Sequence, residues 1–585
     1  MTNVSLPRVP ISRRDLIGAT VLTGLVAASC SASRSSPAPT SNPTPLSTPT
    51  PTTLPPSPTA PLTTTSDPRS TDCGAPPRNP YFADSPAPIG HVDSSQSNAS
   101  PIAGPRDSSR SLEAGDLQYA HLGPAHAGLA ISSKYPDGSR VIWSNGADRV
   151  SKVDAETFEV LAEFALAGKA QLSSVEADAN IALLDQQHGG ELAMTGLGFG
   201  IKYLLGLTGI YYALDVDNTL FVGGEDSVIA YQDAVKGDRR SPIVVRDTWQ
   251  RPAEVTGGFV GVNMTFDGKL VVVTDEGWIV VLSRDFSQYV AVALPGQEAA
   301  AAHNAKVLAS GANLGSASWV RNSIAVDEQG GIYAVSLDAM HKVIWDGAKL
   351  STSAADGAWS VPYLNGGGLG SGATPALMGY CDDRFVVITD GEKQMNVVLF
   401  WRDAIPADWQ QITGTVSQRI AGQALVTMGD PNLTAIQSEQ GVIVGGCGAL
   451  VVNNESPSIP DGYPARAARL LVAFSGNDPA FAPHGMEKFA WDPTQRVFQS
   501  AWVNQEVSSA NGVPLLSLGS NTLYTVGSRA GQWSLEGVDW TTGTSTLTWI
   551  TGSARYNTNF AALFIDGDGR IVHGSVFGIT RYPAA

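Results

Sequence analysis

The 585-residue sequence has few charged residues, and most of those it has are acidic. Charged residues make up only 16% of the chain, and 54 acidic residues face 37 basic ones, for a formal net charge of −17. The chain has no cluster of basic residues, which argues against nucleic-acid binding, because that function depends on a positive surface. No apolar run reaches the roughly 20 residues that a membrane-spanning helix needs.

The signatures of the common catalytic families are missing as well. The sequence holds no G-x-S-x-G elbow, no Walker-type loop, and no H-x-x-x-H or C-x-x-C pair. A serine hydrolase of the elbow type, a phosphate-binding loop and a zinc site are therefore not indicated. The eight histidines are scattered along the chain. No recognised catalytic set emerges from these residues.

The first 29 residues have the features of an export signal. Arg13 and Arg14 stand directly before a short apolar run, Ile17–Ala28. That length suits the hydrophobic region of a signal peptide, about 7–15 residues, better than a transmembrane helix. The stretch Ser12–Ile17 resembles the twin-arginine export motif, which implies export of the protein in its folded state. An N-terminal amphipathic helix is the alternative.

Cys30 ends the apolar run. Val26–Cys30 resembles the bacterial lipobox, in which the cysteine is lipidated and becomes the new N-terminus. The resemblance implies a lipoprotein carrying palmitate-type chains on the extracytoplasmic face of the cell membrane, which acyl chains can hold stably. Cleavage followed by free secretion is the alternative.

Composition divides the chain into three parts: the signal peptide 1–29, a stalk at 30–77 and a body at 78–585. The stalk is rich in Ser, Thr and Pro and has no aromatic residue, so it cannot bury enough apolar surface to fold. Its prolines favour an extended chain. The body, at roughly 500 residues, exceeds one ordinary core and predicts several domains or a repeat architecture.

Three cysteines remain once Cys30 is lipidated, and export makes a disulfide possible. They are Cys73, Cys381 and Cys447. Three is an odd number, so at most one intrachain disulfide forms among them. We expect it between Cys381 and Cys447; the alternative is that all three remain thiols.

A short pattern recurs eight times in the body. It is an apolar strand, a turn of Asp, Asn or Gly, and a second strand of β-branched and aromatic residues, a combination typical of tight β-hairpins. The copies centre on Asp137, Asp217, Asp267, Asp327, Asp383, Glu439, Ser520 and Asp566. A third and usually a fourth strand follow each copy, which predicts an all-β propeller of eight blades, or of seven if one copy is miscounted. The alternative, a parallel β/α fold, would need helices between strands, and only the stretch around Gln297–Ser310 has a helical pattern.

Two kinds of blade carry resemblances to known propellers. Lys152–Phe164 and Gly537–Trp549 resemble the D-x-x-T-G…W signature of quinoprotein dehydrogenases and their non-enzymatic relatives. Arg321–Val335 is similar to the NHL-type and gluconolactonase-like propellers. These resemblances imply the fold and leave the chemistry open, because propellers host enzymes, sensors and scaffolds.

Asparagines stand ahead of several hairpin turns, where the innermost strand of a propeller blade begins. In the gluconolactonase-like family an asparagine there helps to hold a divalent metal, so the resemblance implies Asn322 and Asn263 as ligands, with Ca²⁺ as a possible cofactor. Asn432 and Asn559 would line the same channel. The alternative is that these amides cap backbone groups.

Two functions follow from these patterns. The first is a membrane-anchored envelope lipoprotein whose propeller binds a small molecule or a protein partner. The second is an enzyme acting in the central channel, either a quinone-dependent dehydrogenase or a Ca²⁺-dependent lactonase. We favour the first, because the sequence holds no recognised catalytic set.

Overall fold

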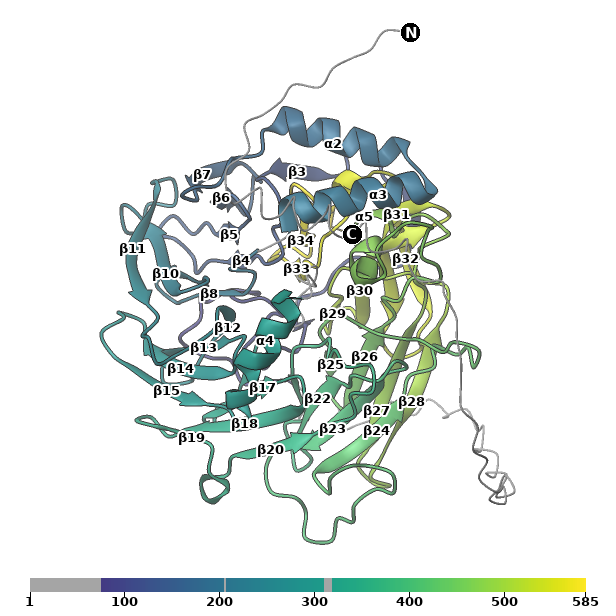
Figure 1. The fold of residues 1–585 in the computed structure, drawn as a ribbon. Helices are drawn as coiled ribbons and strands as arrows, with labels where there is room; N and C mark the ends of the chain where they lie inside the picture. The colour runs from purple at the N-terminus through teal and green to yellow at the C-terminus, as the bar shows by residue number, and fades with distance from the viewer. Residues whose placement is uncertain (1–74, 205–206, 310–317, 585) are drawn as a thin grey trace, which may run out of the picture. The chain divides into compact units, whose positions relative to one another are not determined.

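The computed structural model describes residues 75–204, 207–309 and 318–584. Arg13, Arg14 and Cys30 lie outside these residues, so the expectations for export and lipidation stay predictions. The described residues form eight mainly antiparallel sheets, which follow one another around a common centre (Figure 1). The predicted eight-bladed β-propeller is confirmed.

The first four blades follow the chain in order, each with its first strand at the centre of the ring. From the centre outward, blade 1 consists of β4 (Ala130–Ile131), β5 (Val141–Asn145), β6 (Arg149–Asp154) and β7 (Val160–Ala165), and blade 2 of β8 (Tyr212–Leu214), β9 (Leu220–Gly223), β10 (Ser227–Asp233) and β11 (Ile243–Gln250). Blade 3 consists of β12 (Phe259–Met264), β13 (Lys269–Thr274), β14 (Trp278–Ser283) and β15 (Tyr289–Ala293). Blade 4 consists of β16 (Ala325–Val326), β17 (Gly331–Val335), β18 (Ala339–Trp345) and an outer edge shared by β19 (Leu350–Ser351) and β20 (Trp359–Pro362).

The last four blades include one that both ends of the chain build. In the same order, blade 5 consists of β21 (Ala376–Met378), β22 (Phe385–Thr389), β23 (Asn396–Trp401) and β24 (Ile420–Leu425), and blade 6 of β25 (Ile443–Gly445), β26 (Gly448–Val452), β27 (Met486–Asp492) and β28 (Val497–Asn504). Blade 7 consists of β29 (Leu515–Ser517), β30 (Thr522–Arg529), β31 (Gln532–Asp539) and β32 (Ser545–Ile550). Blade 8 consists of β33 (Leu563–Ile565), β34 (Ile571–Ser575), β35 (Gly578–Arg581) and β3 (Gln118–His121). In blade 8, β3 pairs with β35 antiparallel, so this pairing closes the ring.

Two short strands from the N-terminal part of the body extend blade 7 on both edges. β1 (Ala99–Ser100) pairs parallel with β29 at the centre, and β2 (Ser108–Ser111) pairs parallel with β32 at the rim. β29 and β32 therefore have a neighbouring strand on both sides, and β1 and β2 are the edge strands of this sheet.

The core lies between neighbouring blades, so most strands are buried on both faces. In β13, Val271 and Val273 pack toward Ile332 of blade 4, whereas Leu270 and Val272 pack toward blade 2. A strand buried on both faces has a nearly continuous apolar sequence instead of an alternating one. This burial accounts for the run Leu270–Val273.

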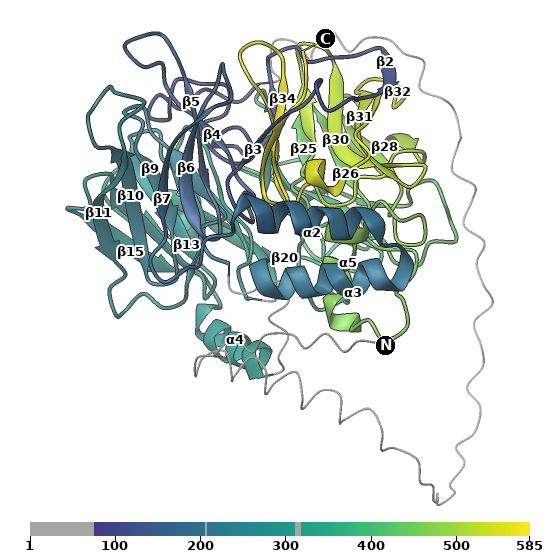
Figure 2. The same ribbon diagram turned by 90° about the horizontal axis from the view of Figure 1, so that it is seen from above.

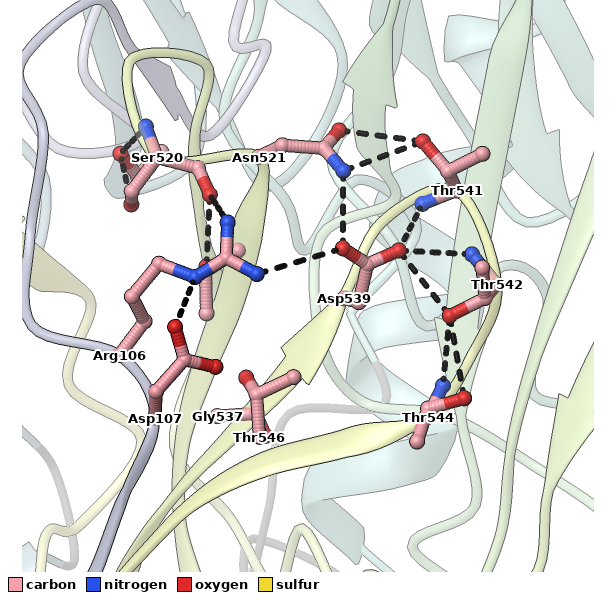
Figure 3. A network of polar contacts seen from close by, with 12 residues as sticks. Arg106, Asp107, Ser520, Asn521, Gly537, Asp539, Thr541, Thr542, Thr544 and Thr546 are labelled. Carbon is pink, nitrogen blue, oxygen red and sulfur yellow. Dashed lines mark hydrogen bonds and ion pairs between the residues drawn. The ribbon is translucent and has the colours of Figure 1, made fainter.

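The blade signature noted in the sequence forms the turn between the third and fourth strands. In blade 7, Asp539 accepts hydrogen bonds from the backbone nitrogens of Thr541 and Thr542 at 3.0 and 2.8 Å (Figure 3). Gly543 closes the turn with φ +76° and donates to the Asp539 carbonyl. Phe158 has the same left-handed conformation, φ +64°, in the corresponding turn of blade 1. The signature thus encodes the turn of a β-hairpin.

Residues 87–98 form a structure that we call the inner belt, which runs around the inside of the channel. Its carbonyl oxygens accept hydrogen bonds from the innermost strands of blades 1, 2, 3, 4, 5, 6 and 7 in chain order. The donors are Ile131 N, Leu214 N, Asn263 Nδ2, Val326 N, Leu377 N, Val444 N and Leu516 N. The belt closes on itself, because Asn98 N donates to the His91 carbonyl at 3.1 Å. It therefore supplies partners for inner strands that have no neighbour on the channel side.

Helices gather on one face of the ring, the helix face (Figure 2). They are α2 (Ser174–Gln186), α3 (Gly189–Phe199) with the π-helical turn η2 (Gly200–Leu204), α4 (Ala300–Ala309) after η3 (Gln297–Ala299), and α5 (Ala468–Ser475) after η5 (Ala465–Ala467); two further short turns are η4 (Ala354–Asp356) and η6 (Ala554–Tyr556). The helix expected around Gln297–Ser310 is confirmed, but the expectation that no other stretch is helical is wrong. In the parts of the chain that the structure describes, no helix is long and apolar enough to span a membrane.

The opposite face carries the hairpin turns between the first and second strands, and we call it the turn face. The described chain begins there. Asn79 Nδ2 donates to the carbonyls of Met264 and Thr265, at 2.9 and 3.2 Å, where the β12–β13 turn begins. The first described residues thus lie on the face opposite the helices.

Candidate ligand-binding cavity

A cavity of about 690 Å³ occupies the channel between the inner belt and the helix face. Gly90 and His91 of the belt line it, as do residues of η2, α4 and α5 such as Leu204, Asn304 and Leu470. Its size lies within the range typical of small-molecule sites, about 300–1,000 Å³. The fold therefore provides a cavity lined by the belt, the blades and the helices.

Two arginines share one glutamate on the wall of this cavity. Arg321 Nη1 and Nη2 donate to the two carboxylate oxygens of Glu439 at 3.0 and 3.2 Å. Arg469, from α5, forms an ion pair with the same carboxylate and also donates to the side-chain oxygen of Gln437. All three charged groups are largely buried, with side-chain exposures of 7% for Arg321, 18% for Glu439 and 20% for Arg469. The cluster carries one positive charge in excess.

Burial disfavours this excess charge. It lowers the pKa of Arg469 to about 9, and the neighbouring charge of Arg321 lowers it further in the same direction. Burial also lowers the pKa of Arg321. A guanidinium whose charge is destabilised in this way gains from a further anion within reach. The wall around Arg469 is therefore suited to a negatively charged group.

Gln440 stands next to this cluster with both ends of its amide unsatisfied. It is 2% exposed and lines the cavity, yet neither Oε1 nor Nε2 has a hydrogen-bond partner among the described residues. An unpaired buried amide costs about 1–3 kcal/mol in a protein. A bound molecule with polar atoms at this position would remove that cost.

His91 presents a hydrogen-bond acceptor from the belt. Its Nδ1 lies 2.8 Å from Asn98 Oδ1, and Asn98 Nδ2 donates to the carbonyls of Val442 and Gln96. The amide orientation makes Nδ1 the donor, which leaves the lone pair on Nε2. Burial lowers the pKa of His91, so the imidazole is neutral, and its ring stacks on Tyr211 at a centroid distance of 5.9 Å.

Two acidic residues line another part of the cavity. Glu225 is exposed and Asp275 is half-buried. Burial raises the pKa of Asp275 to about 6, opposed by the hydrogen bond that Gly258 N donates to its Oδ1 at 2.9 Å. The cavity thus has basic groups at Arg321 and Arg469 and acidic groups in the Glu225 and Asp275 region.

The structure brings two of the four predicted channel asparagines into this cavity. Asn322 and Asn559 both line it. Asn322 Nδ2 donates to the Ser371 carbonyl at 3.0 Å. In the orientation that satisfies its hydrogen bonds, the Asn559 amide nitrogen donates to the carbonyl of Ala473. Both amide nitrogens are therefore engaged with backbone groups.

The other two asparagines lie elsewhere. Asn263 is fully buried in β12, where Nδ2 donates to the carbonyls of Ser94 and Ile324 and Oδ1 accepts from Met264 N. Asn432 is exposed on the loop before β25, and its amide contacts Asp430. Asn263 thus attaches the belt to blade 3, and Asn432 does not line the cavity.

The sequence pattern predicts the sixth hairpin turn at Glu439, and this prediction is wrong. β25 and β26 join through Gly446 and Cys447, seven residues later. Seven residues before Gly446 is Glu439 itself, the same spacing that separates Asn559 from Asp566. Glu439 therefore occupies the channel position that we assigned to Asn432. The dipeptide Gly446–Cys447, between two apolar strands, was the signal that could have corrected the register.

The expected Cys381–Cys447 disulfide is not formed. Cys381 is disulfide-bonded, and Cys447 is not its partner in that bond. Cys447 sits in the tight β25–β26 turn and packs partly against the core shared with blade 5. Cys447 therefore forms part of a hairpin turn and of the adjoining core. The number of cysteines in the sequence alone could not show this position.

No group of three or more histidine, cysteine, aspartate or glutamate side chains among the described residues is arranged to hold a metal ion. The amide nitrogens of Asn322 and Asn263, the two implied calcium ligands, donate to backbone carbonyls. Calcium binding and quinone chemistry remain predictions from resemblance.

The fold and the cavity together define a class: an eight-bladed β-propeller with a cavity at one end of its channel. No protein-family model matches the chain. A protein of Archaeoglobus fulgidus, described only as uncharacterized, is 32% identical over 520 residues, covering 86% of this chain and 89% of that protein. The chain belongs to the same family as this archaeal protein.

Solved structures with similar folds are distant. BamB from Moraxella catarrhalis is 10% identical with a TM-score of 0.43, covering 80% of this chain and 98% of that one. The C-terminal WD40 domain of Sif2 has 9% identity, a TM-score of 0.41 and coverages of 80% and 98%. A streptogramin B lyase is 9% identical with a TM-score of 0.34, and the match covers 80% of this chain and 97% of that one. The fold assignment rests on the eight sheets themselves.

Proposed function

We propose that this protein is a lipid-anchored binding protein of the cell envelope, and that its propeller holds a small-molecule ligand in the cavity under the helix face. The observation that supports ligand binding is the cavity, where Gln440 is buried without partners beside a cluster with excess charge. Groups of this kind are stabilised when a ligand supplies the missing partners.

The anchor is supported by the sequence alone. Arg13 and Arg14 direct the folded protein through the twin-arginine route, Cys30 receives the lipid, and residues 30–77 connect the lipid to the body. Because the described chain begins on the turn face, the cavity lies at the face away from the point of attachment. A ligand would therefore approach from the face opposite the one where the described chain begins.

Ligand binding is tested by filling the cavity. Val260 is half-buried, lies in β12 and lines the cavity. Val260→Trp should abolish the increase in melting temperature that a ligand from a set of small metabolites produces in the wild-type protein. Val245→Trp, at a position 41% exposed on the outer strand β11, is the matched control and should respond as the wild type does. A ligand response that survives in Val260→Trp would contradict binding in this cavity.

Anchoring is tested in growing cells with radiolabelled palmitate. The wild-type chain should take up the label and fractionate with membranes, and Cys30→Ser should do neither. Replacing both Arg13 and Arg14 by lysine should leave unlabelled precursor inside the cell. An unlabelled wild-type chain would refute the proposed lipid anchor, and the proposal of ligand binding in the cavity would still stand.

A further inference from the structure

We infer that the ligand is an organic carboxylate with an apolar body, whose carboxylate is bound by Arg469 and Gln440. This inference rests on the proposed ligand-binding function and adds the chemical class. Three features of the cavity support it: the charge of its wall, the hydrogen-bond donors that the wall offers, and the apolar character of the remaining surface.

The charge of the wall fits a single negative charge. Glu439 is shared by its two arginine partners, so these three groups together carry one more positive than negative charge. A monoanion therefore brings the buried cluster to neutrality. A dianionic phosphate monoester would leave a negative excess next to the Glu439 carboxylate, which burial penalises.

The donors at this wall fit the planar shape of a carboxylate. A guanidinium has five N–H donors, and the contacts of Arg469 with Glu439 and Gln437 use only part of them. Gln440 adds an amide N–H₂ without a partner among the described residues. Guanidinium and amide groups side by side bind both oxygens of a carboxylate more strongly than neutral hydrogen bonds alone.

The rest of the cavity surface is largely apolar. The apolar lining includes Leu204, Phe259, Val260, Leu470, Val513 and Phe560. Burial of a hydrocarbon body against such a surface contributes about 25 cal/mol per Å². The wall thus combines one site for an anion with a volume suited to alkyl or aryl groups.

The test compares two probes of equal size that differ in charge, octanoate and octanamide, by isothermal titration calorimetry on the full-length protein at pH 7. We expect octanoate to bind at least about tenfold more tightly, because a charge-assisted hydrogen bond contributes about 1.5–3 kcal/mol. Arg469→Met should remove this preference by weakening octanoate about tenfold or more, while octanamide changes by less than about twofold. Arg240→Met removes an exposed arginine paired with Glu159 and should leave both affinities unchanged.

The outcomes separate the inference from the proposed function. If octanoate and octanamide bind equally and Val260→Trp abolishes both, the ligand still binds in the cavity and the carboxylate inference falls. If neither probe binds to the wild type, both are overturned. Arg469→Lys retains the charge without the planar fork and should bind octanoate with intermediate affinity. If Arg469→Met fails to fold, the wild-type comparison and this lysine variant still decide the question.

Discussion

The shared glutamate makes a prediction about stability in the absence of any ligand. Glu439 is the only described carboxylate that pairs with both Arg321 and Arg469. Glu439→Gln would remove the carboxylate that these two buried guanidinium groups share. Arg469→Met would leave the Arg321–Glu439 pair intact and balanced. The two substitutions should therefore differ strongly, although each removes one charge from the same cluster.

The structure sets the size of the difference. Removing one partner of a buried ion pair costs about 3–5 kcal/mol, and Glu439 accepts two hydrogen bonds at 3.0 and 3.2 Å from an arginine whose side chain is 7% exposed. Because Glu439 is 18% exposed, we expect the lower end, about 3 kcal/mol, for Glu439→Gln. We expect Arg469→Met to stay within about 1 kcal/mol of the wild type, since it removes both an attraction and a repulsion. The double variant should recover part of the Glu439→Gln loss.

Urea denaturation followed by tryptophan fluorescence measures these free energies of unfolding. The control is Glu159→Gln, which removes an exposed partner of Arg240 and should cost less than about 1 kcal/mol. The reasoning is refuted if Glu439→Gln is no more destabilising than this control. It is also refuted if Arg469→Met destabilises the protein more than Glu439→Gln does.

Three further predictions follow from the fold and the cavity rim. Gly543→Ala should lower the free energy of unfolding by about 2 kcal/mol in urea denaturation, because φ is +76° and a Cβ would lie 2.7 Å from Trp502. The control Gly414→Ala, at φ +89° with open space around the Cβ, should cost only about 1 kcal/mol. An equal loss in the two variants would contradict a clash with Trp502. The folded-state pKa of Asp275, about 6, lies above its ordinary 3.8, so the folded state binds this proton more tightly and the stability of the protein falls as pH rises from about 4 through 6. Melting curves of Asp275→Asn at several pH values should lack this decrease. A pH profile of Asp275→Asn equal to that of the wild type would contradict the assignment of the decrease to Asp275. Deleting residues 578–585 removes β35 and should abolish the cooperative thermal transition, whereas deleting 583–585 should preserve it; a cooperative transition in the longer deletion would show that the ring does not need this strand.

The fold could be predicted because each blade repeats the same local signals. Asp-Gly and Asn-containing turns lie between short strands of β-branched residues, and seven of the eight marked positions fall at or beside the inner hairpin turn. The exception is blade 6, where the turn is Gly446–Cys447 and the acidic residue Glu439 suggested the wrong register. Local patterning therefore determined the number of blades better than their boundaries.

The helices and the belt were less accessible to sequence reasoning. Leu470 and Phe474 of α5 are buried, but this helix is only eight residues long, too short for a clear period of 3.6. The belt has no regular pattern at all. His91, Val92, Gln96 and Asn98 all have positive φ, which no local rule predicts for these residue types together. Its conformation depends on hydrogen bonds to strands hundreds of residues away.

The candidate site was predictable only in part, for the same reason. Asn322 and Asn559 were placed in the channel from their distance to the hairpin turns, and both line the cavity. Arg469 lies on α5, inside the long connection between β26 and β27, and no repeat position marks it. Its meeting with Arg321 and Glu439 depends on how the inserted helix packs over the channel.

The closure of blade 8 has a consequence for how the molecule is made. β3 can pair only after β35 has been made, and β35 follows all the other strands of the propeller in the chain. During synthesis the first seven blades would therefore form an open arc until the ribosome has passed β35. If the chain crossed a membrane during translation, the propeller would have to close on the far side. A pathway that exports folded proteins would instead carry it across with β3 and β35 already paired.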